Sequence, residues 1–202
     1  MIVKKHLLIA LLAGFSLMAC KNDKKAEEAQ PEEEVKLEEQ VKPTYSLEMS
    51  KSSVMARLMT IPEINTMGRL SISASLSDML MAEGPFTVFA PSNDAFIGMD
   101  QEAYQSLLDP SKKDSLVTLL KNHMIPTELG SAELLQQLKG GPVDFTAMGG
   151  AKLVVKMEDN DILITDETGT SSVVSKTDIT AMNGVLHVIN TVLTTGPNPE
   201  ED

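Results

Sequence analysis

Histidine is the side chain best suited to acid–base and metal chemistry near neutral pH, and this chain carries three, His6, His123 and His187. They do not form a His-Glu-x-x-His pair, and the sequence contains no Gly-x-Ser-x-Gly elbow, so the spacings typical of zinc proteases and serine hydrolases are missing. No serine is singled out as the partner of either later histidine. The sequence therefore predicts no catalytic residue, no metal ligand and no cofactor.

A second group with possible chemistry is acidic and surrounds a predicted hairpin. Its members are Asp159, Asp161, Asp166 and Glu167. Carboxylates held close together repel each other, and a bound cation relieves that repulsion. The spacing of an EF-hand loop is absent, so we expect a solvated hairpin edge and keep a weak cation site near Asp159 as the alternative.

Cys20 is the only cysteine, which excludes disulfides within the chain. It follows two lysines and the apolar run Leu7–Ala19, which is too short to span a bilayer but typical of a secretory signal. The segment Leu17–Cys20 resembles the lipobox of bacterial lipoproteins. That resemblance implies removal of residues 1–19 and acylation of Cys20, as by palmitate, at the bacterial outer membrane. The alternative is an ordinary cleaved signal with an incidental cysteine.

Residues 20–44 are rich in glutamate and poor in large apolar side chains, so we expect a disordered tether, with a disordered acidic tail at 196–202. The start of the tether loosely resembles the charged tags that route some lipoproteins to the cell surface, but a solvated spacer explains it more simply. The net charge of −12 argues against nucleic acid as a partner. Attachment to a membrane is therefore expected from the lipid, facing either the periplasm or the medium.

Residues 45–195 have the patterns of one globular domain. Helical spacing appears near residues 49–59, 64–72 and 76–81, in 101–122 with a break at Asp109-Pro110, and in 131–138. Strands are predicted at 86–90, 143–147, 151–157, 162–165, 171–176 and 185–194, with Asn183-Gly184 closing a hairpin. Helices come first and most strands last, which predicts an α+β fold.

The core of this domain must be built from aliphatic side chains and methionine, because 42% of residues are hydrophobic but only 3% are aromatic. Most methionines are therefore expected to fill the core. The alternative is that Met55, Met59, Met79 and Met81 reach the surface and form an adaptable apolar patch.

Two polar residues, Asp94 and His187, lie just after and within predicted strands. His187 lies in a strand that is apolar on both faces, so its ring is expected to be buried and hydrogen-bonded. Ser92 is placed to cap the turn after the strand at 86–90, and Asp94 follows it near the positive end of a helix. Our hypothesis is that Asp94 and His187 lock these two strands together.

Three segments resemble fasciclin domains: Phe86–Phe96, Leu119–Pro126 and Asn183–Leu193. The resemblance implies a wedge of β-strands packed with several short helices, used in adhesion and without typical enzymatic activity. In many members a tyrosine precedes the histidine of the central segment, but here that position is Asn122. Receptor contacts proposed for that tyrosine are therefore not carried over. The signature residues are Phe89, Pro91, Asp94, Phe96, His123, Asn183, Gly184 and His187.

The expected function is a non-catalytic adhesion or binding module that engages an extracellular or envelope protein or a polysaccharide. Two alternatives remain open: a structural envelope lipoprotein that weakly self-associates, and an unrecognised hydrolase of envelope polymers.

Overall fold

The computed structural model describes residues 51–82 and 84–194. The predicted signal segment, Cys20, the tether and the tail at 196–202 lie outside these described residues. Within them, no helix is both long and apolar enough to cross a membrane.

The domain begins with a group of short helices, as the helical spacing predicted. Ser53 caps the first of them, because its hydroxyl accepts a hydrogen bond from the backbone N–H of Ala56 at 3.2 Å. Pro62 cannot continue that helix and instead starts a 3-10 turn. The elements are α2 (Val54–Thr60), η1 (Pro62–Ile64), α3 (Asn65–Ser73) and α4 (Ser77–Met81).

A buried strand and a second group of helices follow. Ser92 caps the helix after the strand by accepting the N–H of Ala95 at 3.1 Å, which confirms the predicted cap. The break predicted at Asp109-Pro110 is present, and Asp109 caps the turn that restarts there. The elements are β1 (Phe86–Pro91), α5 (Asn93–Ile97), α6 (Gln101–Leu107), η2 (Pro110–Lys112), α7 (Lys113–Lys121), β2 (Met124–Ile125) and α8 (Ser131–Leu138).

The last part of the described chain forms consecutive strands. They are β3 (Val143–Thr146), β4 (Lys152–Glu158), β5 (Asp161–Asp166), β6 (Ser171–Ala181) and β7 (Gly184–Ile189). Together with β1 and β2 they form a 7-stranded sheet in the order β2-β1-β7-β6-β5-β4-β3. All neighbours are antiparallel except β1 and β7, which run parallel with Phe89 opposite His187. This mixed sheet with helices confirms the α+β class.

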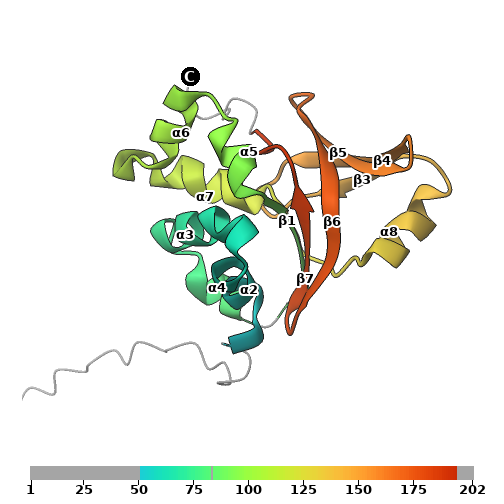
Figure 1. Ribbon diagram of the computed structural model, residues 1–202, viewed down its shortest axis with the longest axis horizontal. Helices are drawn as coiled ribbons and strands as arrows, with labels where there is room; N and C mark the ends of the chain where they lie inside the picture. Colours follow the sequence, from blue (N-terminus) through green and yellow to red (C-terminus); the bar gives the residue numbers. More distant parts are fainter. Residues whose placement is uncertain (1–50, 83, 195–202) are drawn as a thin grey trace, which may run out of the picture. The chain divides into compact units, whose positions relative to one another are not determined.

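Strands β1 and β7 are buried on both faces. Figure 1 shows α2 to α7 gathered on one side of these strands, and β3 to β5 with α8 on the other. Successive side chains of a strand point to opposite faces, so Val88 and Leu186 join the helical cluster, whereas Phe89 and Ile189 join the cluster under α8. Burial on two faces explains why the signature strands read as continuous apolar runs.

Two strand boundaries differ from the predictions by more than one residue. β6 extends to Ala181 because it pairs with β5 in its first part and with β7 in its second, and a register shift before Ile179 lets it bend between them. β7 ends at Ile189, because the side chain of Asn190 then accepts the N–H of Val173 at 2.9 Å in place of a ladder bond.

The methionines mostly fill the core, as predicted. Met67 and Met124 are fully buried, while Met79 and Met81 pack at the margin of the helical cluster. Of the four methionines considered for a surface patch, Met59 is the one that is exposed. The apolar patch is therefore not formed.

Candidate functional site

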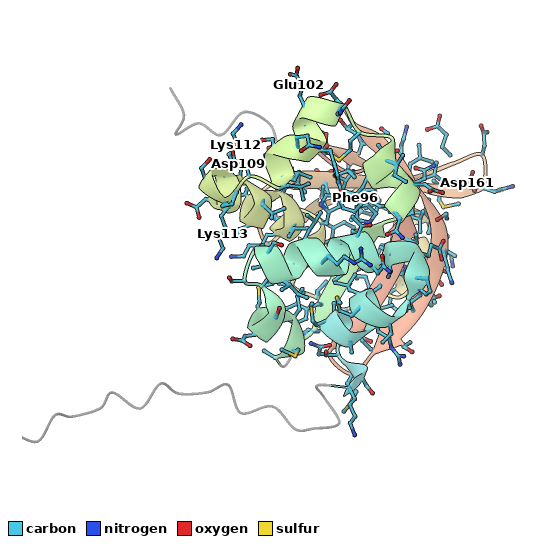
Figure 2. The ribbon with its side chains drawn as sticks, turned by 60° about the vertical axis from the view of Figure 1, so that its left-hand side comes forward. Phe96, Glu102, Asp109, Lys112, Lys113 and Asp161 are labelled. Atoms are coloured by element: carbon cyan, nitrogen blue, oxygen red, sulfur yellow. The ribbon has the colours of Figure 1, made fainter. Side chains whose placement is uncertain are left out.

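A recess of about 520 Å³ lies between α3, α5 and α6. Phe96 is 2% exposed and forms its floor, and Figure 2 shows this residue where the three helices meet. Asn65 and Arg69 of α3 line one wall, and Gln101 and Tyr104 of α6 line another. The volume is in the range of ligand sites, which combine an apolar surface with a few convergent polar groups.

The polar groups of this recess are available for a ligand. Among the described residues, the side chains of Asn65, Arg69, Gln101 and Tyr104 have no hydrogen-bond partner, whereas Asn93 at the margin has two. Asn93 accepts the N–H of Thr66 at 3.0 Å and donates to the carbonyl of Pro62 at 2.6 Å. Its amide thus fixes the start of α3 against α5.

A smaller hollow of about 220 Å³ shares Asn93 with the recess. It is lined by Glu63, Ser92, Asp94 and Ser175 as well. Glu63 pairs with Lys176 at 3.6 Å, and both side chains are about half exposed, so the pair contributes little stability. The two hollows lie on either side of Asn93, whose amide is held by two hydrogen bonds.

His123 is fully buried and both of its ring nitrogens are used by the backbone. Nδ1–H donates to the carbonyl of Leu119 at 2.8 Å, and Nε2 accepts the N–H of Leu193 at 3.0 Å. Burial lowers the pKa of His123 to about 4, against the opposing effects of the Leu119 carbonyl and the negative charge of Asp166. The ring is neutral and serves as a structural bridge.

His187 has the complementary tautomer. Its Nε2–H donates to the carbonyl of Leu129 at 2.8 Å, and its Nδ1 accepts the N–H of Asp178 at 3.3 Å. The ring stacks on Phe89 with centroids 5.7 Å apart, and burial lowers the pKa of His187. The predicted burial and hydrogen bonding of His187 are confirmed.

Asp178 is a structural carboxylate that the sequence patterns did not reveal. It lies in the bent part of β6 at a φ of 61°, and it accepts the N–H of Ser131 at 2.7 Å and the Ser131 hydroxyl. Burial tends to raise the pKa of Asp178, but the hydrogen bonds from Ser131 and the nearby His187 outweigh it and hold the pKa below its ordinary value. One sequence feature could have indicated this role. Gly130 precedes α8 and has no side chain to cap the helix, so the cap must come from another part of the chain.

The four acidic residues considered as a cation site do not converge. Asp159 and Asp161 lie at the turn before β5, whereas Asp166 and Glu167 lie at its other end. Asp166 is 4% exposed, and its carboxylate is hydrogen-bonded to two other backbone positions. Oδ1 accepts the N–H of Thr170 at 2.9 Å, and Oδ2 accepts the N–H of Thr194 at 2.7 Å. The expected solvated edge is confirmed for Asp159, Asp161 and Glu167, which are exposed, but was wrong for Asp166. The described residues hold no group of three or more potential metal ligands.

A family model described as "Fasciclin domain" matches residues 62–195. The chain belongs to the fasciclin-domain family. Protein sll1483 of Synechocystis sp. is 39% identical over 121 residues, which are 60% of this chain. Transforming growth factor-beta-induced protein ig-h3 of Sus scrofa is 34% identical over 130 residues, or 64% of this chain.

Among solved structures, a FAS1 domain pair from the insect cell adhesion molecule Fasciclin I shares the fold. The TM-score is 0.63 with 18% identity over 71% of this chain. The chain spans 61% of the Synechocystis relative, 17% of the pig protein and 51% of the insect structure.

Within this fasciclin domain, the signature segments are joined by backbone pairing of β1 with β7 and by the bond from the N–H of Phe86 to the carbonyl of Asn183 at 3.1 Å. The side chain of Asn183 holds the start of β7 against α2 and the end of α4. Asn183 is 4% exposed; its Oδ1 accepts the N–H of Val54 at 2.7 Å, and its Nδ2 donates to the carbonyls of Leu80 and Ala82 at 3.0 and 2.7 Å. The next residue must be glycine, because a Cβ on Gly184 would lie 2.1 Å from the carbonyl oxygen of Phe86.

Asp94 does not take part in that junction. It is exposed, and no hydrogen bond of its carboxylate appears among the described residues. The hypothesis that Asp94 helps to lock the two strands was therefore wrong, because the first turn of α5 directs this side chain outward. His187 does contribute, because its ring stacks on Phe89 of β1.

Asn122 also has a structural role in this fasciclin domain. It is 3% exposed, and its Oδ1 accepts the N–H of Ala151 at 3.2 Å. A Cβ on Gly149 would lie 2.2 Å from the same oxygen, so glycine is required for this close approach. Pro91, the remaining signature residue, is buried at the end of β1.

Proposed function

We propose that this fasciclin domain is a non-catalytic binding module used for adhesion at the cell envelope, and that its ligand occupies the recess between α3, α5 and α6. The observation that carries the proposal is the lining of that recess. Asn65, Arg69, Gln101 and Tyr104 present polar groups without partners among the described residues over the buried ring of Phe96. Such a surface orients a ligand by hydrogen bonds and holds it by apolar contact.

The chemistry of the domain supports binding without catalysis. A general base must be able to accept a proton, but the nitrogens of His123 and His187 are all engaged by backbone groups. Among the described residues, the lining of the recess includes neither histidine, cysteine nor a carboxylate. It therefore lacks a pair consisting of a nucleophile and its base.

Attachment to the outer membrane through a lipid on Cys20 is part of the same proposal. It is supported by the lipobox-like segment Leu17–Cys20 and by the acidic composition of residues 21–43. A tether of this kind gives the domain reach, and the lipid concentrates many copies on one surface. Weak individual contacts then add up to adhesion. The insect molecule with the same fold is a cell adhesion molecule, which agrees with this use.

The test uses the full-length chain, solubilised in a detergent without a sugar headgroup and applied to an array of glycans and matrix proteins. We expect binding to at least one of these polymers, with no turnover of it over hours. Hydrolysis of a bound polymer would overturn the non-catalytic assignment. A blank array together with concentration-dependent sedimentation would replace the proposal with self-association.

A further inference from the structure

We infer that the recess binds an uncharged oligosaccharide that continues past Asn93 into the smaller hollow. This inference rests on the proposed function and adds the chemical class of its ligand. It follows from three features of the two hollows: the kinds of polar group, the balance of charge, and the way in which the hollows are joined.

The polar groups suit hydroxyls. A sugar hydroxyl both donates and accepts, and the side-chain amides of Asn65 and Gln101 offer a donor and an acceptor in one plane. Tyr104 is half-buried at the wall and packs against the helical core, so its ring has a fixed position. An aromatic ring that combines a flat apolar face with a polar end fits a sugar, whose C–H groups form apolar faces bordered by hydroxyls.

The charges disfavour ionic ligands. Of the part of the chain that the structure describes, Arg69 is the one charged side chain that lines the recess, whereas Glu63 and Asp94 line the smaller hollow. A polyanion would meet these two carboxylates and a chain with a net charge of −12. A cationic ligand would meet Arg69. A neutral oligosaccharide avoids both conflicts, and its hydroxyl groups can donate hydrogen bonds to the exposed carboxylate of Asp94.

The hollows together have the form of an extended site. Asn93 lines both of them, and its two hydrogen bonds hold it in place at the junction. With volumes of about 520 and 220 Å³, the two hollows offer a larger and a smaller subsite. This arrangement also gives Asp94 a function at the surface, where it makes no structural contact among the described residues.

A protein partner fits this surface less well. Stable protein interfaces bury on the order of 800 Å² per partner around a cluster of apolar or aromatic anchors. Ile97, which is 80% exposed, is the one large exposed aliphatic side chain that the described residues contribute to the lining of the recess. The rest of the lining consists of three amides, two hydroxyls, a guanidinium, the partly buried Met99, the buried ring of Phe96 and the partly buried ring of Tyr104.

Calorimetric titration of the full-length chain in the same sugar-free detergent tests the inference. The probes are neutral tetrasaccharides of glucose, mannose and galactose, with a tetrasaccharide of uronic acid as the charged comparison. The variants are Tyr104→Phe, which keeps the ring, Tyr104→Leu, which removes it, and Asp94→Ala. Lys152→Ala in β4, far along the chain in the strand-rich part, is the control.

We expect at least one neutral tetrasaccharide to bind more tightly than the uronic acid. Tyr104→Leu should weaken that binding about tenfold or more. Tyr104→Phe, which removes only the hydroxyl, should weaken it less, and Lys152→Ala should keep it. Asp94→Ala should weaken it without changing the melting temperature. Preference for the uronic acid, or equal binding by Tyr104→Leu and wild type, would overturn the inference.

Failure of this inference differs from failure of the proposed function. If no sugar binds but the chain binds a protein on the array, and a bulky substitution in the recess removes that binding, then the ligand class is wrong and the binding module stands. If neither sugars nor proteins bind, both are wrong.

Discussion

Nε2 of His123 accepts a hydrogen bond from the backbone N–H of Leu193 at 3.0 Å. This bond connects the segment Leu119–Pro126 to the residues that follow β7. This bond exists only while the ring is neutral, because a protonated ring has no acceptor. Burial of the ring lowers the pKa of His123 to about 4, so at neutral pH the ring is neutral and the bond is present.

The stability of the domain is therefore expected to fall as the pH falls from about 6.5 to about 4. The folded-state pKa of His123 lies below the ordinary value, so the unfolded chain binds the proton first and gains from acid. The loss from this residue amounts to about 3 kcal/mol, at 1.36 kcal/mol per pKa unit. Urea unfolding of wild type and His123→Asn at several pH values measures it. An equally steep pH dependence in the variant would assign the effect elsewhere.

Asn183→Ala is expected to lower the free energy of unfolding by about 2 to 4 kcal/mol, because it leaves the N–H of Val54 and the carbonyls of Leu80 and Ala82 without their partner. Denaturant unfolding at pH 7 measures the loss. Gln105→Ala, at an exposed position of α6, should change it by less than about 0.5 kcal/mol and is the matched control. Equal values for the two variants would contradict the role of Asn183.

Asp94→Ala and His187→Ala should separate clearly in thermal melts. Asp94 is exposed, and its carboxylate makes no hydrogen bond among the described residues. The Asp94→Ala variant should therefore have the same melting temperature as the wild type. His187→Ala removes a buried ring that stacks on Phe89 and bridges two backbone groups, and a loss of several degrees is expected. A large destabilisation by Asp94→Ala would restore the hypothesis that Asp94 locks the two strands.

Much of this fold could be predicted from sequence because its elements are locally encoded. The capping serines, Pro62, Pro110 and the apolar runs set the limits of most elements. Pairing over long distances is not encoded in this way. The two-residue strand β2, the cap that Asp178 provides for α8 and the hydrogen bonds of Asp166 depend on residues that only the tertiary fold brings together.

The recess was missed for the same reason. Its polar residues come from α3 and α6, which are separated in the chain by β1 and α5, and no short spacing connects them. The sequence favours a structural role for both Ser92 and Asp94, because both lie where a helix begins. The structure confirms this role for Ser92 but not for Asp94. Which residues are already bonded to the backbone can be determined only from the fold.

Cys20→Ser should release the chain from membranes if a lipid on Cys20 is the anchor. The expected result is a shift of the protein from the membrane fraction to the soluble fraction, together with loss of the acyl mass from the N-terminal peptide. Protease treatment of intact wild-type cells then distinguishes the two orientations, because only a domain that faces the medium is removed. A Cys20→Ser protein that stays in the membrane fraction would contradict lipid anchoring.

Occupation of the recess by the ligand is tested most directly by filling it. Gln101→Trp places a large ring at an exposed position of its wall, and Lys152→Trp places the same ring at an exposed position of β4. With both variants shown to melt like the wild type, the full-length proteins are compared on the array of glycans and matrix proteins. We predict that Gln101→Trp loses about tenfold or more of the affinity for whichever ligand is bound, while Lys152→Trp keeps it. Equal binding by the two variants would contradict the recess as the site.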